Sequence, residues 1–180
     1  MDTAQSEYEI LIQPIEDRMI NSVWRITRDP DDADDAFQDT LAKIWKQFGK
    51  IRRHPNPQAL ILRICANSAY DILRRKNRYR KLEELYSSEY RERQPSSDEL
   101  VLNNERKEEI FRAISQLSRN QASAVLMRFI QELPYSEIAL ALGCAESTAR
   151  KHIARAKDRL YKRLSPVLSD SGEEGKNEKQ

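Results

Sequence analysis

The stretch Leu133–Leu164, LPYSEIALALGCAESTARKHIARAKDRLYKRL, combines a short apolar helix, a glycine and a basic helix. Ile138, Ala139 and Leu142 have the spacing of one helix face, and Gly143 follows them directly. Glycine suits a helix end because it adopts the left-handed backbone conformation without a steric penalty. The small side chain at Ala139 lets a second helix approach closely. The stretch therefore predicts a helix-turn-helix.

The second helix of this pair has an apolar stripe at Ile153, Ala156 and Leu160, and its remaining surface is basic. Residues 143–165 contain 7 basic and 2 acidic side chains, which give a net charge of +5. A one-sided basic helix in this motif is typical of a helix that reads the DNA major groove. The alternative is a helical hairpin whose basic face is simply solvated.

The composition favours an all-α protein. Of 180 residues, 39% are hydrophobic and 33% are charged, and only 4 are glycine, which favours long amphipathic helices. No apolar run reaches the roughly 20 residues of a membrane span, and the acidic N-terminus does not resemble a secretory signal. Cys65 and Cys144 are interpreted as reduced core residues rather than metal ligands. We therefore expect a cytosolic protein without membrane insertion.

Charge alternates along the chain. Residues 1–50 contain 11 acidic and 6 basic side chains, a net charge of −5, and residues 51–81 contain 1 acidic and 9 basic side chains, a net charge of +8. Residues 82–100 return to a net charge of −4, with 6 acidic and 2 basic side chains. Together with the basic helix near the C-terminus, the chain has two positive patches, which suit a polyanion contacted at two places.

The first fifty residues predict two helices. The first covers Tyr8–Thr27, and Pro14 either begins it or kinks it. Asp29 is expected to cap the second, with Pro30 at its first position and an end near Gly49. The apolar positions expected to face the core are Leu11, Ile12, Ile15, Met19, Val23 and Trp24 in the first helix, and Ala33, Ala36, Phe37, Leu41, Ile44, Trp45 and Phe48 in the second.

A Pro-rich basic segment, Gly49–Gln58, predicts a loop, and Asn56-Pro57 is expected to open a helix that ends near Arg78. The helix dipole explains some of the basic residues at its C-terminal end. It does not explain the mixture of hydrogen-bonding and cationic side chains on the outer face, which is what base and phosphate contacts need. That face comprises Arg63, Asn67, Tyr70, Asp71, Arg74 and Arg75.

The second half of the chain predicts further helices after an acidic, flexible linker. Ser97 is expected to cap a helix that extends to Leu117, and Ser118 with Gln121 forms a capping box for the next helix. Ser165-Pro166 is expected to end the last helix before a disordered tail. The predicted organisation is a helical domain over residues 1–81, a linker over 82–97, a helix-turn-helix domain over 98–166 and a tail over 167–180.

Three segments in this order resemble the extracytoplasmic-function (ECF) group of sigma-70 family RNA polymerase sigma factors. DADDAFQDTLAKIW, Asp32–Trp45, is similar to the first signature of that family, and ALILRICANSAYDILRRKNR, Ala59–Arg78, to its promoter-melting helix. The stretch from Ala113 to Leu160 resembles its C-terminal domain. The resemblance implies a region 2 helical bundle and a region 4 helix-turn-helix domain.

The resemblance also implies roles for individual residues. The acidic helix would dock on the β′ clamp helices of core RNA polymerase through Asp32, Asp34, Asp35, Gln38 and Asp39. The basic helix and the loop before it would bind the −10 element, with Asn67 at a flipped base, through Arg52, Arg53, Asn67, Tyr70, Asp71, Arg74, Arg75 and Arg78. The recognition helix would bind the −35 element through Ser147, Thr148, Arg150, Lys151, His152, Ala154 and Arg155.

The leading hypothesis is an ECF-type sigma factor in the bacterial cytoplasm, whose partners are core RNA polymerase (its β′ and β subunits), promoter DNA and, by family expectation, an anti-sigma factor. The alternative is a helix-turn-helix transcriptional regulator that acts without core polymerase. An enzyme is disfavoured, because the sequence has no glycine-rich phosphate loop, no metal-ligand spacing and no nucleophile with a base. No cofactor or metal is expected.

Overall fold

The computed structural model describes residues 8–86 and 108–169, and within these ranges it contains helices and no strand. After a helical turn at 8–11, the elements are η1 (Gln13–Ile15), α2 (Glu16–Thr27), α3 (Pro30–Lys46), α4 (Phe48–Arg52) and α5 (Pro57–Tyr86). A helical segment at 108–115 precedes α7 (Arg119–Phe129), α8 (Tyr135–Leu142) and α9 (Glu146–Ser169). The all-α prediction is confirmed.

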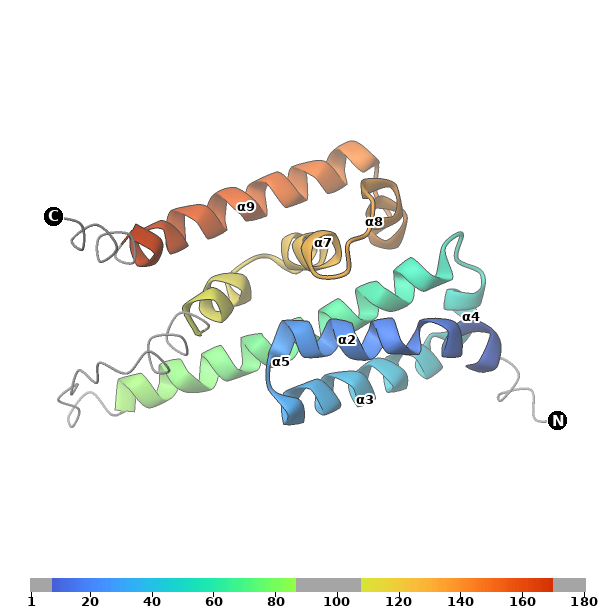
Figure 1. Cartoon of the computed structure of the whole chain (residues 1–180), viewed down its shortest axis with the longest axis horizontal. Coiled ribbons are helices and arrows are strands. Elements are labelled where there is room, and N and C mark those ends of the chain that lie inside the picture. The colour runs from blue at the N-terminus through green and yellow to red at the C-terminus, as the bar shows by residue number, and fades with distance from the viewer. Residues whose placement is uncertain (1–7, 87–107, 170–180) are drawn as a thin grey trace, which may run out of the picture.

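The N-terminal domain, residues 8–86, packs α2 and α3 against the first half of α5 (Figure 1). Asp29 caps α3 as predicted, because its side chain accepts a hydrogen bond from the Asp32 N–H at 3.0 Å. Pro14 lies in η1 at the start of the long helical segment, where its missing N–H costs nothing. The largest fully buried side chains include Ile12, Met19 and Ile44.

Two tryptophans that the helical pattern assigned to the core are on the surface. Trp24 is 48% exposed and Trp45 is 42% exposed. Trp24 lies beneath the Arg28 guanidinium, 5.6 Å from the ring centroid, and Trp45 stacks on Phe48 with ring centroids 5.4 Å apart. Both prediction errors have the same origin, because each tryptophan is adjacent in sequence to a residue that occupies the core position, Val23 or Ile44.

The basic segment between α3 and α5 is partly helical, so the prediction of a continuous loop was wrong. α4 contains Gly49, and Ile51 from the same short helix is completely buried. A buried apolar side chain in this segment fixes it against the N-terminal core. The helix that follows begins at Pro57 as predicted but ends at Tyr86, beyond the expected end near Arg78 and within the expected linker.

The C-terminal domain, residues 108–169, contains the predicted helix-turn-helix. Gly143 ends α8 with a φ of +67°, the left-handed conformation that glycine favours. The Ser118–Gln121 capping box begins α7 as predicted. Ser97, the expected cap of the preceding helix, lies outside the described residues. Ser165-Pro166 does not end α9, which extends to Ser169, because Pro166 removes only one backbone hydrogen bond near the end of the helix.

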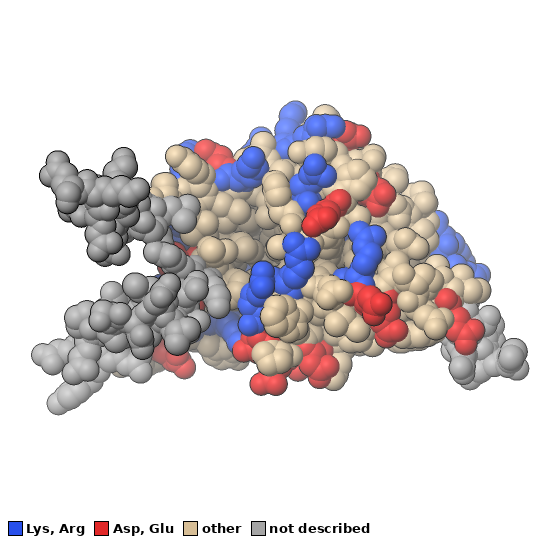
Figure 2. Space-filling view, in the orientation of Figure 1, with Lys and Arg blue, Asp and Glu red and all other residues tan. Residues whose placement is uncertain are grey.

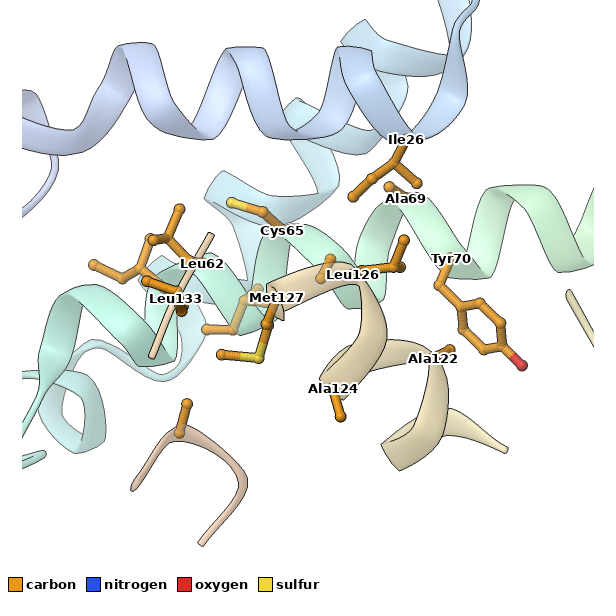
Figure 3. Packing of buried hydrophobic residues seen from close by; sticks show 14 of the residues in the cluster. Ile26, Leu62, Cys65, Ala69, Tyr70, Ala122, Ala124, Leu126, Met127 and Leu133 are labelled. Carbon is orange, nitrogen blue, oxygen red and sulfur yellow. The ribbon is translucent and has the colours of Figure 1, made fainter. Parts of the chain in front are cut away.

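The two domains predicted from the sequence are present, and they pack directly on each other. α7 lies between α5 and α9 (Figure 1), and every residue from 121 to 127 is buried. Leu62, Cys65 and Ala69 of α5 belong to the same hydrophobic cluster as Leu126 and Met127 of α7 (Figure 3). Because residues 121–127 of α7 are buried on every side of the helix, α7 forms the centre of the described structure.

Candidate nucleic-acid interface

The acidic face of α3 is on the surface except at one residue. Asp34, Asp35 and Asp39 are exposed, as is Gln38, whose amide donates to Asp34 at 2.8 Å. Asp32 is buried and forms an ion pair with Lys76 of α5. The structure therefore leaves four of the five predicted polymerase-binding side chains available to a partner and uses the fifth to join α3 to α5.

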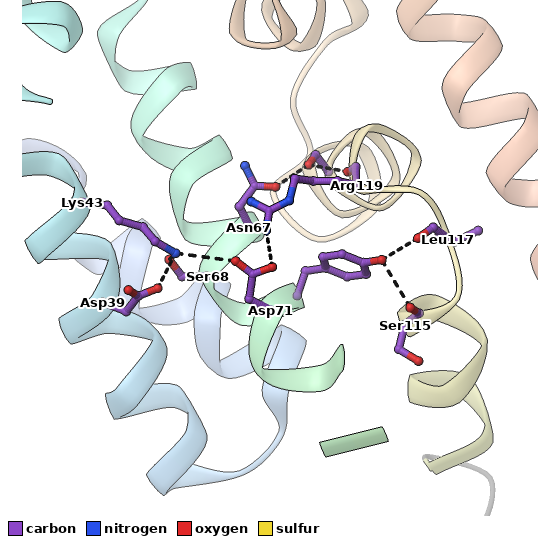
Figure 4. Close-up of polar contacts among 10 residues, drawn as sticks. Asp39, Lys43, Asn67, Ser68, Asp71, Ser115, Leu117 and Arg119 are labelled. Carbon is purple, nitrogen blue, oxygen red and sulfur yellow. Dashed lines mark hydrogen bonds and ion pairs between the residues drawn. The ribbon is translucent and has the colours of Figure 1, made fainter. Parts of the chain in front are cut away.

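Asp39 belongs to a small polar network between α3 and α5 (Figure 4). Lys43 Nζ lies 2.5 Å from an Asp39 carboxylate oxygen, 3.2 Å from Ser68 Oγ and 3.7 Å from the Asp71 carboxylate. Desolvation alone would raise the pKa of Asp39, but the hydrogen bonds from Lys43 and Ser68 and the nearby positive charge of Arg75 lower it overall. Asp39 is therefore ionised and already has a cation beside it.

On α5, the three polar residues predicted to face outward contact the C-terminal domain instead. Ser123 Oγ donates to Asn67 Oδ1 at 2.7 Å, and Arg119 donates to the Asp71 carboxylate at 2.5 Å (Figure 4). Tyr70 is only 1% exposed, which corrects the prediction that it lies on the outer face. Its position on the helix suggested solvent, but the C-terminal domain, including the segment just before α7, packs over it.

Tyr70 is held by backbone carbonyls from the chain just before α7. Its hydroxyl donates to the Leu117 carbonyl at 2.5 Å, with the Ser115 carbonyl at 3.3 Å (Figure 4). Burial raises the pKa of Tyr70, and the negative charge of Asp71 acts in the same direction. The phenol is thus a neutral donor in an enclosed site.

A groove of about 1090 Å³ runs beside these contacts. Charged side chains of α3, α5 and α7 line this groove. They are Asp35, Asp39 and Lys43 of α3, Asp71, Arg74, Arg75, Arg78 and Lys81 of α5, and Arg119 of α7. Arg74, Arg75 and Arg78 are exposed, and Arg75 lies 3.9 Å from the Asp35 carboxylate. Arg52 and Arg53 are exposed at the opposite end of the domain, around the end of α4.

The recognition helix α9 presents its predicted face to solvent. Its buried stripe is Ala149, Ile153 and Ala156, which pack toward the domain core. The predicted DNA-binding residues lie on other sides of the helix: Ser147, Arg150, Lys151, Ala154 and Arg155 are exposed, and Thr148 and His152 are half-buried. On the face shown in Figure 2, basic side chains lie along the upper edge, where α9 runs, and across the middle of the molecule, and acidic side chains gather along the lower edge.

Arg150 is held in place by two neighbours that the sequence did not indicate. Its guanidinium lies 4.0 Å from the centroid of the Tyr135 ring and donates to Glu146 Oε1 from Nε at 3.1 Å. Arg128 also lies over the Tyr135 ring, at 4.8 Å. Tyr135 begins α8, so the first helix of the pair orients a cation on the second.

Several contacts between the domains were also missed. Arg63, expected on a solvent-facing surface, donates to the Ala141 carbonyl at 2.7 Å. Arg119, Ser123 and Gln131 gave no signal in the sequence as interface residues, although a buried polar side chain such as Gln131 is uncommon without a specific partner. In the described residues no group of His, Cys, Asp and Glu could hold a metal ion, and no helix there is long and apolar enough to cross a membrane.

The chain is similar in sequence to known proteins over both of its domains. The family model "Sigma-70 region 2" matches residues 11–79, and "Sigma-70, region 4" matches residues 107–160. The ECF RNA polymerase sigma factor SigM of Mycobacterium tuberculosis is 30% identical over 150 residues, which cover 82% of this chain and 72% of SigM. This chain belongs to the ECF group of sigma-70 family RNA polymerase sigma factors.

Other relatives of this ECF sigma factor also match over most of their length. The RNA polymerase sigma-H factor of Pseudomonas aeruginosa is 23% identical over 172 residues, which cover 91% of this chain and 89% of the relative. Among solved structures, a complex of the sigma factor RpoE with the anti-sigma factor NepR from Bartonella quintana has a TM-score of 0.48 and 22% identity, covering 92% of this chain and 98% of that one.

Proposed function

We propose that this ECF sigma factor binds core RNA polymerase and the −10 element through residues 1–81, and the −35 element through residues 98–166, with residues 82–97 as linker and 167–180 as tail. The observation that carries this proposal is that two cationic helices, α5 and α9, lie in different domains, with an acidic helix beside the first. Such an arrangement lets the protein contact one promoter at two elements. Binding at one element raises the effective concentration of the second element.

The polymerase contact is assigned to the acidic face of α3. Three exposed carboxylates and an exposed amide on one helix, Asp34, Asp35, Asp39 and Gln38, support this role. Asp32 contributes indirectly, because its ion pair with Lys76 positions α3 on α5. The partner surface is expected to be basic and helical, as the family's binding to the β′ clamp helices implies.

The −10 contact is assigned to Asn67, Tyr70 and Asp71 together with the surrounding arginines. A base flipped out of the stack needs hydrogen bonds to its edge and cations near its phosphates, since unstacking costs a few kcal/mol. The groove along α5 supplies the cations, because Arg74, Arg75 and Arg78 line it. The amide of Asn67 lies on the same helix, about two turns before Arg74.

The −35 contact is assigned to the exposed face of α9. Arginine is the side chain that most often makes bidentate hydrogen bonds to guanine in the major groove, and Arg150 and Arg155 are both exposed there. Thr148 is better placed for a phosphate contact, because it is half-buried in the first turn of the helix.

Three further features complete the proposal. The protein acts in the bacterial cytoplasm, where core polymerase and DNA are found. It has no catalytic activity of its own, and the chemistry of RNA synthesis belongs to core polymerase. An anti-sigma factor restrains it, an assignment that rests on the family resemblance.

The test is reconstituted transcription with bacterial core polymerase on a genomic promoter library, with and without this protein. We expect new start sites that share paired upstream elements. Asn67→Ala should weaken the preference at the −10 element and Arg155→Ala the preference at the −35 element. Lys162→Ala is the matched control on α9, because Lys162 is exposed and paired with Asp158 at 3.0 Å, outside the assigned face. If no start sites appear and the protein binds duplex promoter DNA without core polymerase, the sigma assignment fails.

A further inference from the structure

A second cavity, of about 510 Å³, lies where α2 meets the chain just beyond the end of α7. Arg18, Asn21 and Arg25 of α2 line it together with residues 130–132. None of the surfaces assigned to polymerase or to DNA includes these residues. Cavities of roughly 300–1000 Å³ at domain boundaries are common small-molecule sites, so this cavity has a suitable size and place for a ligand.

The three polar residues that α2 contributes share one face of the helix. Arg18, Asn21 and Arg25 are three and four positions apart, a spacing that places their side chains one above the other. All three are exposed, whereas the intervening Ser22 is buried. The cavity is therefore lined by two cations with an amide between them.

The two arginines converge although they are about two turns apart on α2. Arg18 Nη2 donates to the Gln131 carbonyl at 3.1 Å, and Arg25 Nη1 donates to the Ile130 carbonyl at 2.6 Å. Those carbonyls belong to consecutive residues. In the described part of the chain each guanidinium makes only this one hydrogen bond, so most of its donors remain available. Two like charges that converge at a cavity attract an anion.

One carboxylate, that of Glu132, lines the cavity beside these cations. It lies 3.7 Å from Arg25 Nη1, which is too long for a hydrogen bond, and its side chain is 76% exposed. An exposed pair of this kind contributes little to stability, so a ligand can displace the carboxylate into solvent. The remaining lining then has two positive charges, from Arg18 and Arg25.

The rest of the lining combines unused polar groups with apolar side chains. The Asn21 side chain makes no hydrogen bond with any described residue, so its amide N–H is a third donor. Gln131 is 7% exposed, and within the described residues its Oε1 is buried without a donor. Leu62 and the half-buried Ile130 supply apolar surface. Such a site suits a small molecule with an anionic end and an apolar body.

We propose that this cavity binds a small molecule carrying a phosphate monoester, with the phosphate held by Arg18, Arg25 and Asn21 and the rest of the ligand against Ile130. A phosphate monoester has close to two negative charges and three terminal oxygens, which match two guanidinium groups and one amide. A carboxylate has one charge and two oxygens and matches them less well. The proposal goes beyond the sigma function and does not depend on the −10 or −35 assignments.

The first experiment measures binding to the full-length protein by isothermal titration calorimetry at about 0.15 M salt. The probes are phenyl phosphate, inorganic phosphate and phenol. Phenyl phosphate is expected to bind with a Kd of about 1 mM or tighter, inorganic phosphate more weakly, and phenol not at all. If the wild-type protein binds neither phosphate, the proposal is overturned.

Two substitutions on α2 test the position of the phosphate. Arg18→Ala is expected to weaken phenyl phosphate binding at least about 10-fold, because a charged hydrogen bond is lost. Asn21→Asp is expected to weaken it at least about 5-fold, because it adds a negative charge at the site. Since the Asn21 side chain has no hydrogen bond to lose, this second variant should fold normally.

The matched control for both is Lys50→Ala, which removes an exposed cation of the same domain away from the cavity. It should bind phenyl phosphate like wild type. If Arg18→Ala and Asn21→Asp also bind like wild type, the phosphate lies elsewhere and the proposal is overturned.

The direction of a third change separates a ligand site from a structural contact. Glu132→Gln removes the carboxylate that the phosphate displaces, so phenyl phosphate should bind up to about 5-fold more tightly. Asp158→Asn, which removes an exposed carboxylate from α9, should leave the affinity unchanged. An unchanged or weaker affinity in Glu132→Gln would contradict the placement of the phosphate beside Arg25.

The last arm asks whether the cavity instead holds the backbone of a nucleic acid. The probe is a single-stranded oligonucleotide without a terminal phosphate. We expect it not to displace phenyl phosphate, and Asn21→Asp to bind it no more weakly than Lys50→Ala does. If the oligonucleotide competes with phenyl phosphate and Asn21→Asp weakens both equally, the cavity contacts nucleic acid and the small-molecule proposal is wrong.

Discussion

The two cationic helices of this sigma factor are presented in opposite ways. On α9, the buried stripe of Ile153 and Ala156 faces its own domain, and the arginines face solvent. On α5, one side packs on α2 and α3 and the polar side packs on α7, so that Tyr70 is enclosed. A basic helix with suitable residues can therefore bind DNA only where no other part of the chain covers it.

The largest expected effect is on DNA binding by α9, the helix whose cationic face is exposed. Arg155→Ala should weaken binding of the free protein to duplex −35 DNA by about 1–3 kcal/mol, because a base contact made by an exposed arginine needs no rearrangement. Fluorescence anisotropy at fixed salt measures this, with Lys162→Ala as control. An equal loss in both variants would mean that α9 contributes only charge.

A smaller effect is expected on the covered helix. Tyr70→Phe should lower the free energy of unfolding by about 1–2 kcal/mol, because the carbonyls of Leu117 and Ser115 lose their donor in a buried site. Urea unfolding measures the change, and Tyr161→Phe serves as control because Tyr161 is 72% exposed. A Tyr70→Phe protein as stable as wild type would contradict the enclosed position of this hydroxyl.

A third prediction concerns the positioning of Arg150 on the open helix. Tyr135→Leu should reduce discrimination between correct and altered −35 bases by about 0.5–1 kcal/mol, because the guanidinium loses the ring on which it lies. Tyr135→Phe keeps the ring and should retain discrimination. Competition binding with single-base variants of the element measures the difference, and equal losses in both variants would rule out the ring as the cause.

The smallest effect is expected in the reactivity of the Cys65 thiol, which lies on the side of α5 that faces the N-terminal core. Burial raises the pKa of the Cys65 thiol to about 12, so it should resist thiol reagents at pH 8. Cys144, which is half-buried, should react. Arg119→Ala should leave Cys65 protected, because this substitution removes a contact between Asp71 and the C-terminal domain and no contact within the N-terminal core. Rapid labelling of Cys65 in that variant would show that the two domains unfold together.

Local rules predicted most helix beginnings correctly and several helix ends incorrectly. Asp29, the Ser118–Gln121 pair and Gly143 act through contacts within a few residues, so their roles can be recognised from the sequence. Pro166 predicted the end of the last helix, but α9 extends further. The basic segment with Gly49 predicted a loop, but the short helix α4 forms there. In α4 the burial of Ile51 outweighs the local preference for a loop.

The sequence alone determined the all-helical class, the helix-turn-helix and the charge of each binding helix, because these depend on periodicity and on residues close together in the chain. Only the tertiary structure decided that Asn67, Tyr70 and Asp71 are covered, since their partners lie 45 to 56 positions away and include backbone carbonyls that have no signature in the sequence. A side chain on the outer face of one helix is exposed only until another helix packs there, and that depends on the complementary surfaces of both.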